Sequence, residues 1–153
     1  MKELLEKYPP SMESLLDILH ELQAAEPRHY LTRDALRAVA EYVNVPLSEV
    51  VSTATFYSMY SLAPRGRHIV RICESPPCQL VGADSLLDLL TEQFGVAVGE
   101  TTPDGAFTLE TTSCLGACAE APSMMVDDEV YGNLTKEKAL SVIAEVSRSD
   151  AAR

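Results

Sequence analysis

Apolar residues in the first third of the chain recur at a helical period. Over residues 15–22 they fall on one face of a helix, and a second such face follows Thr32, whose side chain can cap a helix N-terminus. A third helix is expected to begin near Pro46 or Ser48, because proline is tolerated in the first turn of a helix. Residues 1–64 are therefore predicted to form a small N-terminal helical bundle.

The hydrophobic pattern changes in the second part of the chain. Residues 68–72 form a short run rich in β-branched side chains, which predicts a strand that ends at the first cysteine, Cys73. A helical stripe of apolar residues follows over 80–94, and Gly95 stands where a C-terminal cap is expected. Residues 106–112 then alternate as a second strand, so this part begins with the order strand, helix, strand.

A hairpin and a last helix complete the predicted elements. Residues 123–126 and 129–131 have the pattern of two strands joined by an Asp-Asp turn, and Thr135 can cap the helix after them. This order predicts an α/β domain over residues 65–148, closer to a thioredoxin-like fold than to a β-grasp ferredoxin. Residues 149–153 are predicted to be a flexible tail.

The chain has a formal net charge of -11, and the acidic excess is confined to one segment. Residues 73–133 hold eleven Asp and Glu and no Lys, Arg or His, whereas the rest of the chain holds twelve acidic residues and twelve Lys or Arg. This disfavours nucleic-acid binding, which needs a basic surface. Two interpretations of the segment stay open: a solvated acidic surface, or a face that docks on a basic partner.

Membrane insertion and secretion are not expected. No apolar run approaches the roughly 18 to 20 residues that span a bilayer, and the first residues lack the apolar core of a signal peptide. The expected location is therefore the cytoplasm, including the cytoplasmic face of the inner membrane if partners attach the chain to a membrane complex.

The four cysteines form two short-spaced pairs, Cys73-x4-Cys78 and Cys114-x3-Cys118, separated by 35 residues. Each pair follows a predicted strand, so the fold can bring the two together at a metal centre. Four thiolates suit a [2Fe-2S] cluster and also suit zinc, although no histidine follows Cys73 to join a zinc site. A thiol-disulfide enzyme would need a Cys-x-x-Cys spacing, which is absent. Spacing thus favours an iron-sulfur cluster and leaves a zinc-stabilised interaction module as an alternative.

The surroundings of the cysteines add to the case for iron and sulfide. A [2Fe-2S] cluster on four thiolates is an anion that becomes more negative on reduction, so it needs nearby hydrogen-bond donors. A helix that starts just after Cys78 would direct N–H groups at the sulfurs, and Gly116 would let the backbone approach them closely. The acidic surroundings predict a low reduction potential. We also expect each short cysteine pair to hold one iron.

Several stretches of the chain together resemble one known family. They are Ala54-Thr55-Phe56-Tyr57, Cys73-x4-Cys78, the run from Val98 to Gly105, Cys114-Leu115-Gly116-Ala117-Cys118, and Ala121-Pro122. The combination is similar to the thioredoxin-like [2Fe-2S] subunit of respiratory complex I (NADH-quinone oxidoreductase), the 24 kDa subunit family. The helical N-terminal part also matches the family layout, so the resemblance covers nearly the whole chain. One departure is the first cysteine loop, which reads Glu-Ser-Pro-Pro where many members carry a Gly-Thr pair.

The resemblance implies that Cys73, Cys78, Cys114 and Cys118 are the ligands of one [2Fe-2S] cluster. The chain would exchange single electrons with the FMN of an NADH-oxidising flavoprotein subunit, as a redox subunit of an NADH dehydrogenase complex with no catalytic residues of its own. Because the chain has no glycine-rich nucleotide motif, FMN and NAD(H) are expected in the partner, and further iron-sulfur subunits are expected beside it. The same subunit type occurs in NAD-linked hydrogenases, formate dehydrogenases and electron-bifurcating complexes, and these parent complexes stay open.

The segment Ala54 to Tyr57 has two interpretations. Its aromatic side chains lie at helical spacing, which favours packing in the core, whereas the alternative is a subunit interface. Met124 and Met125 are expected to alternate across a strand as packing residues rather than as ligands.

Overall fold

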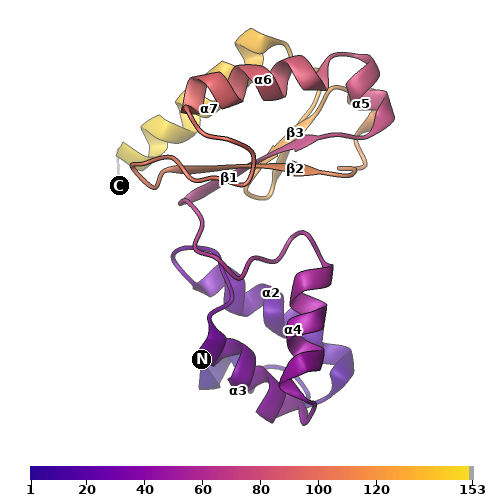
Figure 1. The fold of residues 1–153 in the computed structure, drawn as a ribbon, viewed down its shortest axis with the longest axis vertical. Coiled ribbons are helices and arrows are strands. Elements are labelled where there is room, and N and C mark those ends of the chain that lie inside the picture. Colours follow the sequence, from indigo (N-terminus) through magenta and orange to yellow (C-terminus); the bar gives the residue numbers. More distant parts are fainter. Residues whose placement is uncertain (152–153) are drawn as a thin grey trace. The chain divides into compact units, whose positions relative to one another are not determined.

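The computed structural model describes residues 1–151 (Figure 1). The chain divides into two compact units, Met1–Arg65 and Gly66–Arg153, and each has its own hydrophobic core. The boundary predicted from the sequence lies one residue earlier, after residue 64. Across the described residues, no helix combines the length and apolar character that crossing a membrane requires.

The first unit is built from helices. They are α1 (Lys2–Leu5), the short 3-10 helix η1 (Met12–Ser14), α2 (Leu15–Ala25), α3 (Arg33–Val43) and α4 (Leu47–Phe56). Thr32 caps α3 as predicted, because its hydroxyl accepts a hydrogen bond from the backbone N–H of Ala35 at 3.1 Å. Leu19, Val39 and Val50 bring α2, α3 and α4 into one buried cluster.

The favoured interpretation of residues 54–57 as core is wrong for both aromatic side chains. Ala54 is buried with Val50, but Phe56 is 80% exposed and Tyr57 is also exposed. Two residues along a helix correspond to about 200° around its axis, so Phe56 lies on the face opposite Ala54. Apolar character at helical spacing therefore did not indicate which face the aromatic residue occupies.

The second unit contains a four-stranded sheet in the order β2-β1-β3-β4. The strands are β1 (His68–Cys73), β2 (Phe107–Thr112), β3 (Met124–Val126) and β4 (Glu129–Tyr131). β1 and β2 are parallel, whereas β3 is antiparallel to both β1 and β4. The helices α6 (Ala83–Phe94) and α7 (Lys136–Ala151) cover one face of this sheet (Figure 1).

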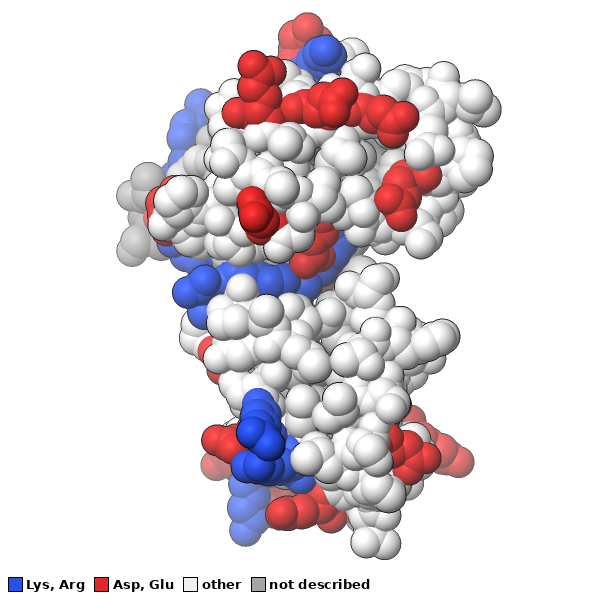
Figure 2. Space-filling model, in the orientation of Figure 1, with Lys and Arg blue, Asp and Glu red and all other residues white. Residues whose placement is uncertain are grey.

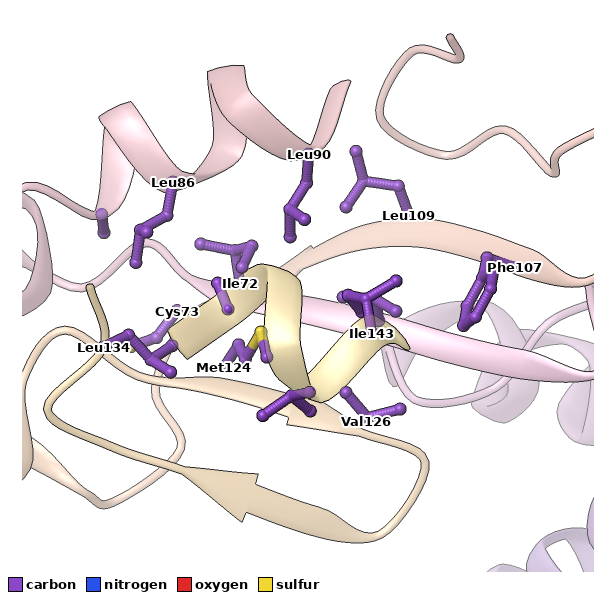
Figure 3. Close-up of a cluster of buried hydrophobic side chains, with 14 of the residues drawn as sticks. Ile72, Cys73, Leu86, Leu90, Phe107, Leu109, Met124, Val126, Leu134 and Ile143 are labelled. Atoms are coloured by element: carbon purple, nitrogen blue, oxygen red, sulfur yellow. The ribbon is translucent and has the colours of Figure 1, made fainter. Parts of the chain in front are cut away.

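The core of the second unit lies between these helices and the sheet (Figure 3). Alternate residues of each strand point into it, as the pleat of a strand requires: Ile72 of β1, Leu109 of β2 and Met124 of β3 meet Leu90 of α6 and Ile143 of α7. The packing role predicted for Met124 is confirmed, because its side chain is fully buried in this cluster.

The helix predicted over residues 80–94 begins three residues later than expected, because Leu80 ends a separate short helix. A short helix, α5 (Pro76–Leu80), comes first, and α6 begins only at Ala83. Between them Gly82 has a φ of 101°, a conformation that ends one helix and redirects the chain into the next. As a result Leu80 is 87% exposed, although it continues the apolar stripe of α6 in the sequence.

The tail predicted at residues 149–153 is wrong over residues 149–151, which continue α7. Asp150 accepts a hydrogen bond from Arg67 Nε at 2.9 Å, and its other oxygen lies 3.0 Å from His68 Nε2. These contacts at the start of β1 fix the last turn of α7, because a charged pair holds a helix end that would otherwise fray. The remaining residues of the predicted tail, 152 and 153, lie outside the described part of the chain.

Candidate metal centre

The first cysteine loop starts where β1 ends. Cys73 is the last residue of β1, and Cys78 lies within α5, whose first two positions are Pro76 and Pro77. Proline suits these positions because the first N–H groups of a helix have no partner inside it. The N–H of Cys78 donates to the Ser75 carbonyl at 2.9 Å, and this turn folds both cysteines inward. Both are 1% exposed, and we name them the inner pair.

The second cysteine loop follows β2. Cys114 and Cys118 are both exposed, and we name them the outer pair. Gly116 stands between them with a φ of 75°, which only glycine adopts without strain. Its N–H lies 3.4 Å from Cys114 Sγ and donates to it, so the backbone approaches this sulfur as the sequence predicted.

The parallel pairing of β1 and β2 brings the two loops together. In this register Cys73 is opposite Thr112, so both loops leave the same edge of the sheet. The N–H of Glu74 donates to the Thr112 carbonyl at 2.9 Å, and the Ser75 hydroxyl donates to the carbonyl of Ser113. The four predicted ligands therefore lie on two adjoining loops.

Hydrogen bonds from the backbone favour the charged form of the inner Cys73. Burial alone raises the pKa of this thiol, but the N–H groups of Ser75 and Leu115 and the side chain of Cys78 more than offset it, and the pKa is lowered. Leu115 belongs to the loop of the outer pair, so that loop supplies a donor to the inner pair.

Within the outer pair the pKa of Cys114 is lowered and the pKa of Cys118 is raised. The N–H of Gly116 is the main cause of the lowered pKa of Cys114, with further contributions from the Ser75 hydroxyl and Cys118. The side chain and charge of Cys114 raise the pKa of Cys118, and the inner pair adds to this effect. The pKa values of the outer pair therefore depend on groups of both cysteine loops.

The prediction that a helix starting just after Cys78 would direct its N–H groups at the sulfurs is wrong. No helix starts just after Cys78, because that residue already belongs to α5, and the next helix begins at Ala83. With proline at its first two positions α5 also lacks two N–H groups at its start. The donors to sulfur come from loop N–H groups instead, namely those of Ser75, Leu115 and Gly116.

Sequence reasoning did not assign a role to two serines at this centre. Ser75 links the loops through its hydroxyl, and its place between Cys73 and Cys78 was a signal for such a role. Ser123 lies next to the inner pair, with its Oγ 3.6 Å from Cys78 Sγ. Only the register of β3 with β1 places Ser123 there, and the sequence carries no local signal for it.

The donor set fits a [2Fe-2S] cluster. Such a cluster takes four thiolates and has two irons, so two pairs of cysteines on adjoining loops are the arrangement it needs. In the part of the chain that the structure describes, no three His, Cys, Asp or Glu side chains converge on one point as they would around a single ion. The four cysteines are the residues here that could hold the cluster.

The sheet, its two covering helices and the paired cysteine loops define a thioredoxin-like α/β ferredoxin. The family model described as "Thioredoxin-like [2Fe-2S] ferredoxin" matches residues 1–147. The chain therefore belongs to this family, and the fold class and the family resemblance predicted from the sequence are confirmed.

Curated relatives carry names from two kinds of complex. "NADP-reducing hydrogenase subunit HndA" of Solidesulfovibrio fructosivorans is 33% identical over 143 residues, which cover 94% of this chain and 82% of the relative. A relative named as a subunit of the NADH-quinone oxidoreductase of Mycobacterium tuberculosis (strain ATCC 25618 / H37Rv) is 38% identical over 149 residues, which cover 97% of this chain and 58% of the relative. The chain thus spans little more than half the length of the mycobacterial relative.

A solved structure supports the fold. The NAD+-reducing [NiFe]-hydrogenase in the air-oxidized state superposes on this chain with a TM-score of 0.77 at 21% sequence identity. The match covers 89% of this chain and 23% of the hydrogenase chain. At this identity the likeness concerns the arrangement of helices and strands.

Proposed function

We propose that the chain is an electron-transfer subunit that carries one [2Fe-2S] cluster on Cys73, Cys78, Cys114 and Cys118. The observation that carries this proposal is the placement of two cysteine pairs on adjoining loops at one edge of the sheet. When bound, the cluster supplies a one-electron redox centre. The chain's own residues hold it, with one iron on each pair, and surround it with N–H donors.

The two cysteine pairs differ in burial, so one side of the centre is accessible to a partner and the other is not. The inner pair is covered by the fold, whereas the outer pair is exposed. Leu80 and Val81 follow the inner pair directly and are both exposed apolar side chains. The exposed outer pair is the side of the centre that a redox group of a partner can approach. We therefore propose that electrons enter and leave through this face.

The proposed partner is the NADH-oxidising flavoprotein subunit of the same complex, whose FMN exchanges single electrons with this centre. The parent complex is most like NADH-quinone oxidoreductase, and the alternative is an NAD-linked hydrogenase, formate dehydrogenase or electron-bifurcating complex. The names of the relatives support an NADH-quinone oxidoreductase and a hydrogenase as parent complexes. FMN and NAD(H) belong to the partner in this proposal, and the chain does no bond chemistry itself. It would work in the cytoplasm, at the face of the inner membrane where the complex is membrane-bound.

An acidic stripe supports docking by charge. Asp84, Asp88 and Glu92 are exposed and lie four residues apart along α6, so they share one face of the helix. Figure 2 shows acidic side chains in a row over this helix. Like charges at this spacing weaken a helix slightly. A basic surface on the partner would relieve that repulsion, and the stripe would speed the encounter.

The first experiment measures the cofactor. The full chain is purified anaerobically, analysed for iron, sulfide and zinc, and examined by absorption and EPR spectroscopy before and after dithionite. About two irons and two sulfides per chain with an S = 1/2 signal on reduction are expected. Cys114→Ser and Cys118→Ser should change that signal, whereas Ser113→Ala, a neighbouring control, should not. A colourless, zinc-loaded wild type would overturn the proposal in favour of a zinc-stabilised module.

The second experiment tests the partner and the docking face. The cluster-loaded chain is mixed with the NADH-oxidising FMN protein of an NADH-quinone oxidoreductase, and reduction by NADH is followed by stopped-flow absorption. Charge reversal of the three α6 acids should slow reduction most at low salt. Reversal of Glu3, Glu13 and Asp34, exposed acids of the helical unit, is the matched control. Equal rates for both variants would argue against docking through the acidic stripe.

A further inference from the structure

Ser123 is a buried hydroxyl at the inner pair. The residue precedes β3, is 1% exposed, and accepts a hydrogen bond at its backbone carbonyl from the N–H of Cys73 at 3.1 Å. Its Oγ lies 3.6 Å from Cys78 Sγ, within the range of a hydrogen bond to sulfur. Among the residues that the structure describes, that sulfur is the partner recorded for this hydroxyl.

The direction of this hydrogen bond depends on the charge of the sulfur. A thiol and a hydroxyl can each donate to the other, but a thiolate can only accept. Once Cys78 is a thiolate ligand, the Ser123 hydroxyl must donate to it or stay buried without a partner, which is unfavourable. A hydrogen bond to a charged acceptor away from water is among the stronger ones in proteins.

We propose that Ser123 is a positioning residue that donates a hydrogen bond to the Cys78 thiolate and thereby raises the reduction potential of the cluster. The inference rests on the proposed function and adds a residue that sets how readily the centre accepts an electron. Reduction adds one negative charge, part of which the cysteine sulfurs carry. A donor aimed at such a sulfur therefore stabilises the reduced state more than the oxidised state. No bond forms or breaks, and the proton stays on Ser123 Oγ.

Ser75 has a different place at the centre, because its hydroxyl is shared among several acceptors. A serine hydroxyl has one proton to donate, and that of Ser75 lies within reach of the Ser113 carbonyl and of the Cys73 and Cys114 sulfurs. Ser75 therefore links the two cysteine loops, whereas the acceptor recorded for the Ser123 hydroxyl is the sulfur of Cys78. The two serines can therefore be compared within one protein: Ser75 links the two cysteine loops, and Ser123 donates a hydrogen bond to a cluster ligand.

The test compares reduction potentials of the full, cluster-loaded chain. Wild type, Ser123→Ala and Ser123→Thr are titrated anaerobically with dithionite and mediators, and reduction is followed by EPR. The alanine variant is expected to lower the ratio of reduced to oxidised cluster at a fixed potential by up to about tenfold, or about 59 mV for one electron. The threonine variant keeps a hydroxyl and should restore the wild-type potential. Thr108→Val, which removes a fully buried hydroxyl elsewhere in the sheet, should leave the potential unchanged.

A spectroscopic readout separates tuning from a structural effect. The Fe–S stretching bands of the wild type are recorded in H2O and D2O by resonance Raman spectroscopy. An O–H···S hydrogen bond predicts a deuterium shift that is smaller in Ser123→Ala and retained in Ser123→Thr. Should the alanine variant not load, Ser123→Val replaces it, because valine and threonine have the same shape and differ in the hydroxyl.

The possible outcomes distinguish this inference from the proposed function. A wild type without iron and sulfide would overturn the proposed function, and the inference with it. A loaded wild type whose potential and deuterium shift are the same in the variants that lack the hydroxyl would overturn the role of Ser123 alone. A lower potential in those variants, with rescue by threonine, would establish it.

Discussion

The break at Gly82 between α5 and α6 can be tested with two leucines. Leu80 and Leu90 belong to the same apolar stripe in the sequence, but Leu90 is fully buried on the core-facing side of α6 and Leu80 is 87% exposed. Leu90→Ala removes roughly three methylene equivalents at about 0.8 kcal/mol each. The cavity left behind brings the expected loss of stability to about 3 kcal/mol. Leu80→Ala makes the same chemical change at the surface and should cost less than about 0.5 kcal/mol.

Hydrogen–deuterium exchange of the full chain, read by mass spectrometry, is the suitable assay. The chain has two units, so one unfolding curve need not report on either of them alone. Peptides from β1 and β2 report on the second unit directly. A loss of about 3 kcal/mol corresponds to about a hundredfold faster exchange in Leu90→Ala, since 1.4 kcal/mol is about tenfold. Equal exchange in the two variants would refute the assignment of Leu80 to a separate, exposed helix end.

Three further predictions concern a half-buried histidine, a glycine and a helix cap. Burial lowers the pKa of His68, but hydrogen bonds with Asp127 and Asp150 outweigh it and raise the pKa. His68 therefore stabilises the second unit fully below its unfolded pKa of about 6.5, and this contribution is lost as pH rises through the folded pKa. Hydrogen–deuterium exchange of β1 and β2 peptides at several pH values should lack this pH dependence in His68→Asn, once intrinsic exchange rates are taken into account. Gly116→Ala should cost about 1–2 kcal/mol through its positive φ, with no clash, seen as faster cluster loss. Thr32→Ala should cost about 1 kcal/mol, seen as about fivefold faster hydrogen–deuterium exchange in peptides of α3.

Much of the second unit could be predicted from the chain because its signals are local. The strand ending at Cys73 is short, β-branched and bounded by turn residues, and it forms as expected. Gly95 adopts the left-handed conformation of a helix C-cap at the predicted end of α6. Asp127 likewise turns the hairpin with a φ of 54°. Each of these features depends on a few neighbouring residues.

The errors have a common physical cause, since burial depends on contacts that are distant in sequence. Leu80 and Phe56 are apolar residues within periodic stretches, yet both are exposed, because nothing in the periodicity says where a helix stops or which face finds a partner. Asp150 is polar and near the end of the chain, which favoured a tail, but contacts with Arg67 and His68 hold it in α7. In each case tertiary structure overrode the local pattern.

The candidate centre shows the same division between local and distant determinants. Cys73 and Cys78 could be identified from their spacing, and the structure places them on one inward-facing turn. Their relation to the outer pair depends on the parallel register of β1 and β2, and a slip of one residue would turn every side chain of β1 to the opposite face. The core side chains Ile72 and Leu109 oppose such a slip because both must stay under α6. The hydrophobic core therefore sets the geometry of the cysteines, and changes that loosen it should weaken the hold on the cluster before they unfold the chain.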